Sequence, residues 1–139
     1  MTLTDAAPHY ALADASQSVN HRRCIEALAN LPKPLITTWP CFTEAMYLLL
    51  MAGGWRLQNL LWSYIESGTL QFYNLEDSDL RRMRVLMEKY ADTPMDLADA
   101  SLVATAESLG LKRIFTLDSD FHFYVTKRRD RLEITPSPI

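Results

Sequence analysis

Apolar and polar positions alternate along the chain in blocks that predict short strands separated by longer helices. Runs of β-branched and aromatic residues indicate strands, and apolar residues at helical spacing indicate helices. The predicted strands are Thr2–Thr4, Leu35–Thr38, Leu70–Leu75, Arg113–Thr116 and Leu132–Thr135. The predicted helices are Ala6–Ala13, Ser16–Leu31, Pro40–Met51, Trp55–Glu66, a helix capped by Asp77 or Ser78 that runs to Tyr90, and a helix from Thr93 and Pro94 to Gly110.

This alternation of strands and helices predicts parallel strands joined by helical crossovers. We therefore expect the α/β class, as a three-layer α/β/α sandwich with a central, mainly parallel sheet. A chain of 139 residues fits a single domain over 1–139 and can bury a core without disulfides. Its 48% apolar and 22% charged residues are typical of a folded globular protein rather than a disordered one.

The two cysteines and the N-terminal residues indicate a cytoplasmic protein. Cys24 and Cys41 lie in apolar, helical contexts without metal-ligand spacing, which predicts buried, reduced thiols. The N-terminus lacks the basic and apolar segments of a signal peptide. The most apolar run, Ala45–Met51, is far shorter than the roughly 20 residues that span a bilayer, so no membrane association is expected.

Acidic residues at the ends of two predicted strands are the first indication of function. Asp5 directly follows the first strand, and Asp118 follows the strand Arg113–Thr116. Each has an ordinary explanation, because Asp caps helices and favours tight turns. Ligand sites of α/β folds also lie at the carboxyl ends of parallel strands, so both residues are candidates for one site.

Glu44 is a third candidate because it is the only charged residue between Lys33 and Arg56. Its neighbours are largely apolar, and a buried carboxylate is costly unless it is paired or binds a metal ion. A position at the rim of the helix would remove that cost.

Asp96 and Asp99 lie three residues apart and would share one helix face. If Thr93 caps the helix and Pro94 begins it, Asp96 is the third helical residue and completes a capping box. Asp99 then lies beyond the first turn, where capping does not explain it, so it is the more informative of the two.

Such acids would converge on one end of the sheet and repel one another. Two carboxylates about 4 Å apart cost about 4 kcal/mol at an effective dielectric constant of about 20. A bound cation would relieve this repulsion, and ligation by oxygen alone suits Mg²⁺ or Mn²⁺ better than Zn²⁺. The histidines show no zinc-binding spacing.

Four segments resemble, in order and spacing, the motifs of the PIN-domain family, and within it the VapC-type toxins of bacterial toxin–antitoxin pairs. The segments are Thr4–Pro8, Thr37–Ala45, Pro94–Ala104 and Ile114–Phe121. The resemblance implies a ribonuclease that depends on Mg²⁺ or Mn²⁺ and hydrolyses phosphodiester bonds. It also implies RNA as substrate, an antitoxin as partner and a homodimer.

The resemblance also assigns site residues. The catalytic and metal-binding acids would be Asp5, Glu44, Asp99 and Asp118. The accessory residues would be Asp96, Thr116 and Asp120, and Asp120 remains an alternative to Asp118 as the fourth ligand.

Basic residues gather locally although the net charge of −3 argues weakly against nucleic-acid binding. Lys127, Arg128 and Arg129 are the candidate RNA-binding residues because they are close in sequence to Asp118. His21–Arg23 form another basic group. For any single cluster, a solvated helix face or an antitoxin contact is the preferred interpretation.

Two alternatives within the family remain open, an RNA-processing nuclease without an antitoxin and a non-catalytic domain that only binds partners. The segment Trp55–Ile65 has more apolar residues than one core-facing stripe needs, which predicts a homodimer face or a groove for an antitoxin helix. A phospho-acceptor receiver domain is disfavoured because no lysine follows the late strand until Lys127.

Overall fold

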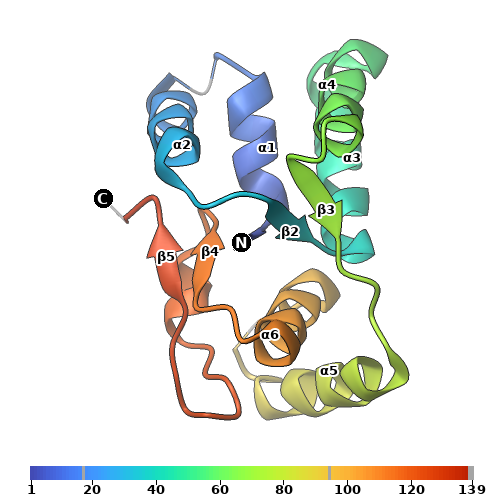
Figure 1. Ribbon diagram of the computed structural model, residues 1–139, viewed down its shortest axis with the longest axis vertical. Helices are drawn as coiled ribbons and strands as arrows, with labels where there is room; N and C mark the ends of the chain where they lie inside the picture. The colour runs from blue at the N-terminus through green and yellow to red at the C-terminus, as the bar shows by residue number, and fades with distance from the viewer. Residues whose placement is uncertain (17, 94, 138–139) are drawn as a thin grey trace.

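The computed structural model describes residues 1–16, 18–93 and 95–137, and it places one five-stranded sheet between two groups of helices (Figure 1). The strands are β1 (Thr2–Thr4), β2 (Leu35–Thr37), β3 (Leu70–Phe72), β4 (Arg113–Phe115) and β5 (Glu133–Thr135). The helices are α1 (Ala6–Ala13), α2 (Ser18–Asn30), α3 (Trp39–Gly53), α4 (Trp55–Glu66), α5 (Asp77–Lys89), α6 (Leu97–Leu109) and the 3₁₀ helix η1 (Ser119–His122). The predicted α/β class is confirmed.

The sheet is parallel throughout, with the strand order β3-β2-β1-β4-β5. Leu3 of the central strand pairs with Ile36 of β2 and Ile114 of β4. From β1 the chain builds β2 and β3 to one side and then β4 and β5 to the other. The order therefore reverses between β1 and β4, which is where open α/β sheets bind their ligands.

Helices cover both faces of the sheet, so consecutive strand residues are buried on opposite sides. Helices α1 to α4 lie over one face, and α5 and α6 lie over the other (Figure 1). Ile114 packs in the core on the α5 and α6 side, while Phe115 packs with residues of α1 to α4. This double burial explains why all three residues of β1 and of β2 are buried, rather than alternately buried and exposed.

The predicted start of α6 is wrong. Thr93 and Met95 instead form turns, because the Thr93 amide donates to the Tyr90 carbonyl and the Met95 amide donates to the Thr93 carbonyl. The helix begins at Leu97. Pro94, the first residue of the predicted helix, lies outside the described residues.

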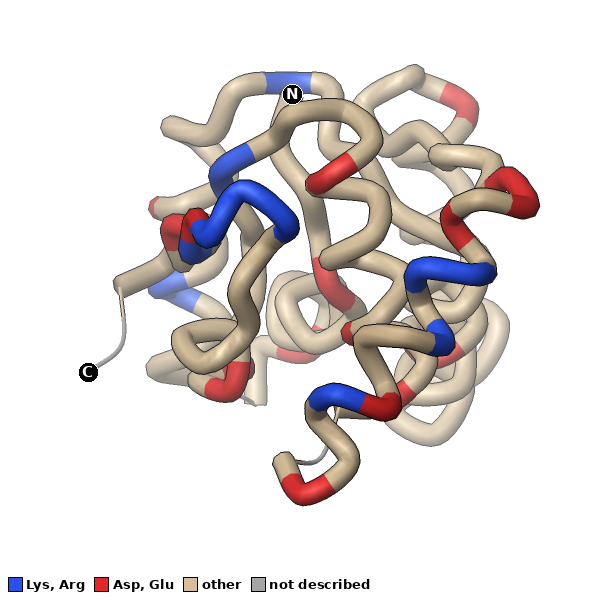
Figure 2. Tube along the Cα trace, turned by 90° about the horizontal axis from the view of Figure 1, so that it is seen from below, with Lys and Arg blue, Asp and Glu red and all other residues tan. Residues whose placement is uncertain are grey.

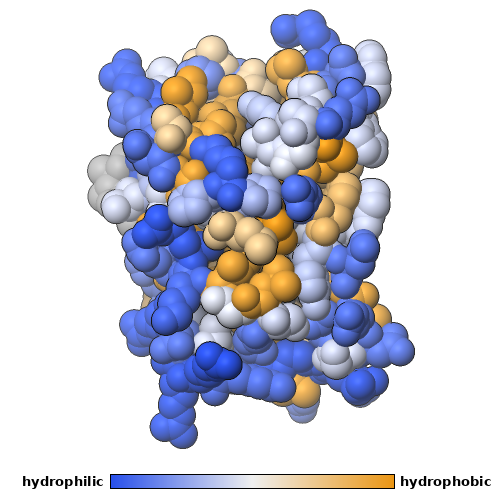
Figure 3. All heavy atoms as spheres, in the orientation of Figure 1, coloured by the Kyte–Doolittle hydropathy of each residue, from blue (hydrophilic) through white to orange (hydrophobic). Residues whose placement is uncertain are grey.

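Apolar side chains reach the surface over α3 and α4, on the right of Figure 3. Trp55, Leu60 and Trp62 of α4 are exposed, whereas Leu57 and Leu61 of the same helix are buried. The predicted excess of apolar residues over one core-facing stripe is therefore present in α4.

The predicted buried thiols are confirmed. Cys24 and Cys41 are buried and free. Within the described part of the chain, no helix is both long and apolar enough to cross a bilayer.

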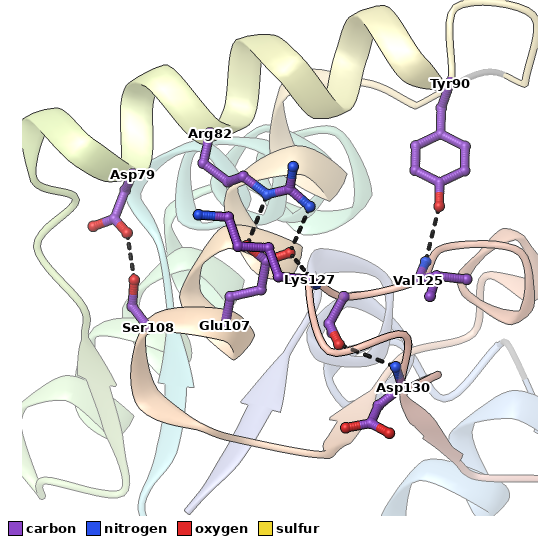
Figure 4. Close-up of polar contacts among 9 residues, drawn as sticks. Asp79, Arg82, Tyr90, Glu107, Ser108, Val125, Lys127 and Asp130 are labelled. Carbon is purple, nitrogen blue, oxygen red and sulfur yellow. Dashed lines mark hydrogen bonds and ion pairs between the residues drawn. The ribbon is translucent and has the colours of Figure 1, made fainter.

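Asp79, in the first turn of α5, is a buried carboxylate that sequence reasoning did not single out. The helix begins at Asp77 after the N-cap residue Glu76, so the predicted caps Asp77 and Ser78 are already helical. The Asp79 carboxylate accepts hydrogen bonds from the Tyr73 hydroxyl at 2.6 Å and the Glu76 amide at 2.9 Å. Ser108 of α6 donates a further bond at 2.5 Å (Figure 4).

These bonds make Asp79 a structural acid. Burial alone would raise the pKa of its carboxyl, but the bonds from Ser108, Tyr73 and Glu76 bring that pKa below its ordinary value. The ionised carboxylate therefore stabilises the junction between α5 and α6.

We expect Asp79→Ala to lower the free energy of unfolding by about 3 kcal/mol, because it leaves three donors without their charged acceptor. Urea denaturation at neutral pH measures this loss. The difference in unfolding free energy between the wild type and Asp79→Ala should shrink as the pH falls below the unfolded-state pKa of Asp, because the folded-state pKa of Asp79 is lower still. Asp77→Ala, an exposed first-turn position, is the control, and an equal loss in both variants would contradict this role.

Candidate active site

Four elements bring the predicted acids to the carboxyl edge of the sheet. Asp5 directly follows β1, and Asp118 follows β4 and caps η1. Glu44 lies on α3, and Asp99 lies in the first turn of α6. The charge of Asp118 raises the pKa values of the other three acids, and the charge of Asp5 raises those of Glu44 and Asp99, so the acids lie within electrostatic reach of one another.

Asp5 is 7% exposed and caps α1 while it faces the site. One carboxylate oxygen accepts a hydrogen bond from the Ala6 amide at 2.7 Å, and the other accepts one from the Thr116 hydroxyl at 2.8 Å. Burial raises the pKa of Asp5 above its ordinary value against these bonds, and the charge of Asp118 raises it further. The helix cap and the site position, which the sequence left as alternatives, are therefore compatible.

Thr116 joins the ends of β1 and β4 through its buried hydroxyl. The hydroxyl donates to Asp5 and accepts a hydrogen bond from the Asp118 amide at 3.0 Å. The Asp118 carboxylate in turn accepts the Asp120 amide at 2.8 Å, which starts η1. Partial burial raises the pKa of Asp118, and the charge of Asp120 adds to the shift. Thr116 and Asp120 thus lie beside the candidate acids.

Asp96 and Asp99 form a capping box, with roles different from those predicted. Asp96 is the N-cap, and its carboxylate accepts the Asp99 amide at 2.8 Å. Asp99 is the third helical residue, and its carboxylate accepts the Asp96 amide at 3.4 Å. Capping does explain Asp99, so the prediction for this residue is wrong. The reason is that α6 begins after Asp96 rather than at Pro94.

The environment of Asp99 nevertheless disfavours its charged form. Burial raises its pKa to about 7, and the charges of Asp96 and Asp5 contribute to this shift. The Tyr124 hydroxyl donates to the Asp99 carboxylate at 3.2 Å. Sequence reasoning missed Tyr124, because nothing in its local pattern separates it from an ordinary core aromatic residue.

Glu44 is exposed, so the burial inferred from its apolar neighbours is wrong. Tyr47 and Leu50 are 61% and 52% exposed, which shows that this face of α3 points to solvent rather than to the core. Partial desolvation still raises the pKa of Glu44, and the charges of Asp5 and Asp96 add to that shift. Glu44 therefore lies at the rim of the acidic cluster.

No cation neutralises these acids within the described residues. The ion pairs there, Arg82–Glu107 and Arg113–Glu133, involve none of the acids at the carboxyl edge. Their oxygen-only donor set suits a hard divalent cation. Over residues 1–16, 18–93 and 95–137, however, no three Asp, Glu, His or Cys side chains come close enough together to hold a metal ion. The set fits such an ion in its chemistry but is more open than a closed metal site.

Arg23 of α2 is the basic residue that shares a cavity with one of the acids. This cavity has a volume of about 160 Å³ and is lined by Arg23, Thr116 and Asp118 among others. The Arg23 guanidinium donates to the Asn20 side-chain oxygen at 3.2 Å and the Ser137 carbonyl at 2.5 Å. Both acceptors are neutral, so the Arg23 charge is not compensated by them. The sequence indicated this residue only as part of the group His21–Arg23.

The candidate RNA-binding segment lies away from the acids. The Lys127 amide donates to the Glu107 carboxylate at 3.0 Å, near the C-terminal end of α6. Glu107 follows Asp99 by eight residues on this helix, which corresponds to a separation of about 12 Å along its axis. Lys127, Arg128 and Arg129 form the longest run of basic residues in the trace (Figure 2). Lys127 therefore lies near the end of α6 opposite to Asp99.

An open, largely apolar surface lies beside Asp96. It includes Trp39, Leu97 and Asp96. Trp39 is 51% exposed, and its ring stacks on Phe72 with 4.1 Å between centroids. One face of the indole ring is thus supported by the protein while much of the side chain remains accessible.

Comparisons with known proteins agree with this architecture. The PIN domain family matches residues 7–126. VapC20 from Mycobacterium tuberculosis, described as a sarcin–ricin loop cleaving toxin, is 17% identical, with a TM-score of 0.78 over 86% of this chain and 92% of that chain. A toxin–antitoxin complex from Klebsiella pneumoniae contains a chain that is 20% identical, with a TM-score of 0.64 over 87% of this chain and 90% of that one.

At these identities the structural matches establish the fold alone. No curated protein matches this sequence. The family match covers most of the chain, including three of the four predicted acids, and Asp5 lies just before it. The chain belongs to the PIN-domain family.

Proposed function

We propose that this PIN domain is an endoribonuclease that uses Mg²⁺ or Mn²⁺ to hydrolyse phosphodiester bonds in RNA. The observation that carries the proposal is the cluster of Asp5, Glu44, Asp99 and Asp118, whose pKa values are all raised. Asp79 shows the contrast, because hydrogen-bond donors lower the pKa of that structural acid. Acids that destabilise one another at one edge of a sheet are typical of a functional site.

Asp5 and Asp99 would be the primary ligands of the metal ion, with Glu44 and Asp118 completing the set. When bound, a divalent cation supplies Lewis acidity and stabilises the charge that develops during phosphoryl transfer. The two primary ligands are the more buried members of the cluster, at 7% and 6% exposure. Glu44, at the exposed rim, is free to adjust its position.

Neighbouring residues would hold these ligands in place. The Thr116 hydroxyl fixes one oxygen of Asp5 and orients the backbone of Asp118. The Asp96 amide and the Tyr124 hydroxyl both donate to the Asp99 carboxylate. Donors around ligating carboxylates keep them oriented, so Asp96, Thr116 and Asp120 would act as supporting residues.

Arg23 and Trp39 give the site features that suit a nucleic-acid strand. The guanidinium of Arg23 lines the same cavity as Asp118, where it would contact a backbone phosphate of the substrate. The exposed indole of Trp39 would provide a stacking surface for a base.

We further propose that the protein is the toxin of a toxin–antitoxin pair and forms a homodimer. This assignment rests on the family and on the structural likeness to proteins described as a toxin and as a toxin–antitoxin complex. The exposed apolar residues of α3 and α4 offer a surface for either kind of partner.

We expect Asp99→Asn to reduce RNA cleavage more than about a hundredfold, because the amide cannot supply the negative charge of a metal ligand. Cleavage of mixed tRNA and mRNA with Mg²⁺ or Mn²⁺, compared with EDTA, measures the loss. If the purified wild type, free of any partner and loaded with metal, cuts no RNA, the nuclease proposal is wrong.

The same substitution should stabilise the protein in EDTA. Because the folded-state pKa of Asp99 is about 7 and therefore above its unfolded value, wild-type stability is lost as the pH rises toward and through 7. We expect Asp99→Asn to raise the melting temperature by several degrees at pH 8 and little at pH 4. In a domain of this size, a gain of 1 kcal/mol in the free energy of unfolding raises the melting temperature by roughly 3–6 °C.

Added Mg²⁺ should stabilise the wild type more than Asp99→Asn, since it binds only the intact set of acids. Asp92→Asn, which removes one exposed acid outside the cluster, is the control. Equal responses of Asp99→Asn and Asp92→Asn to metal and pH would contradict the shared electrostatic site.

We expect Arg23→Ala to raise KM for RNA about tenfold and to lower kcat less, because a phosphate contact contributes mainly to binding. The slope of log affinity against log salt should fall in magnitude by about 1. Arg22→Ala, the exposed neighbour of equal charge, is the control. If both variants lose affinity equally, Arg23 has no specific position in the site.

A further inference from the structure

A second cavity lies at the far end of α6 from the acids. It has a volume of about 260 Å³ and opens between the end of this helix and the loop that precedes β5. We call it the α6-end pocket. Its apolar residues include the buried Ala106 and Leu132, and its basic residues are Lys112, Lys127, Arg128 and Arg131.

The basic residues of the α6-end pocket are exposed, and none of them forms an ion pair in the described part of the chain. Two acids also line the pocket, Glu107 and Asp130. Glu107 is already neutralised, because Arg82 of α5 holds its two oxygens at 2.9 and 3.0 Å (Figure 4). The pocket therefore carries an excess of positive charge that its own acids do not balance.

The loop that carries three of these cations, Lys127, Arg128 and Arg131, is hydrogen-bonded to its surroundings. Lys127 is tied to Glu107 through its amide, and the Val125 amide donates to the Tyr90 hydroxyl at 2.9 Å (Figure 4). The Thr126 amide donates to the Asp130 carbonyl at 2.9 Å, which closes the turn. Contacts with both α5 and α6 thus set the pocket's shape before any ligand arrives, which reduces the entropic cost of binding.

We propose that the α6-end pocket binds a nucleoside phosphate, with the base on the apolar floor and the phosphate among the basic side chains. Apolar walls with a few convergent charged groups are typical of small-molecule sites, and guanidinium groups suit phosphate oxygens. The ligand is either one nucleotide of an RNA strand or a free mononucleotide. Binding of an RNA strand rests on the proposed function, whereas binding of a free mononucleotide does not.

A strand nucleotide in this pocket would lie about 10–12 Å from Asp99 along the axis of α6, which is the rise from that residue to Ala106 and Glu107. The pocket would thus fix a part of the substrate remote from the cut. Substrates long enough to reach both positions would bind more tightly than short ones, because the second contact is intramolecular.

Binding measured in EDTA tests the proposal without cleavage. A fluorescent oligoribonucleotide and a set of ribonucleoside monophosphates are titrated against the wild type and the double variant Arg128→Ala/Arg131→Ala. We expect the double variant to lose affinity at least about tenfold for one of these ligands. Loss for the oligonucleotide alone assigns the pocket to an RNA strand, and loss for a monophosphate assigns it to a free nucleotide.

The matched control is Arg81→Ala/Arg84→Ala, which removes two exposed charges from α5 outside the pocket. Equal losses in both double variants, or no binding of either ligand by the wild type, would overturn the proposal. Cleavage assays on the same proteins keep the two ideas apart. Specific binding without metal-dependent cutting would overturn the nuclease and retain the pocket. Metal-dependent cutting by the wild type, with equal binding losses in the two double variants, would retain the nuclease and overturn the pocket.

Discussion

Repulsion among the carboxylates at the carboxyl edge of β1 and β4 is the constraint on which the rest of this structure depends. The domain limits its effect by giving the two most buried acids, Asp5 and Asp99, fixed hydrogen-bond donors. Asp5 accepts hydrogen bonds from the Ala6 amide and the Thr116 hydroxyl, and Asp99 accepts them from the Asp96 amide and Tyr124. The amide bonds are also helix caps, so the interactions that begin α1 and α6 are the ones that hold the acids. Burial nevertheless keeps the pKa values of both acids raised, which leaves a site that favours a cation.

These hydrogen bonds can form because the strands and helices that carry the acids are packed against one another in the core. Leu3 and Ile114, from adjacent central strands, are both fully buried. The Thr38 hydroxyl lies 2.6 Å from the Ser101 hydroxyl, which links the start of α3 to α6. This buried contact fixes the helix of Glu44 against the helix of Asp99. Buried polar pairs of this kind specify one arrangement of elements, because an unsatisfied hydroxyl there would be costly.

Charge is separated along α6. Asp96 and Asp99 lie at its N-terminal end, where the helix dipole favours acids, and the basic residues around Lys112 and Lys127 lie near its C-terminal end, where the dipole favours cations. The net charge of −3 hides this separation. One helix thus presents a cation-attracting edge and an anion-attracting pocket at opposite ends. In the proposed function, an RNA strand bound at the acidic edge would also contact the basic pocket.

The sequence by itself determined the strand Thr2–Thr4, the helix Trp55–Glu66, the parallel direction of the strands and the acids that follow two of them, Asp5 and Asp118. These features depend on residues a few positions apart, whose periodicity and capping preferences are local. The tertiary structure decided the exposure of Glu44, the shift of the capping box from Thr93 and Asp96 to Asp96 and Asp99, and the contacts of Arg23 and Tyr124. It also placed Lys127 near the end of α6 opposite to Asp99. Exposure and distance between elements depend on how helices pack across the sheet, and local patterns carry no information about that packing.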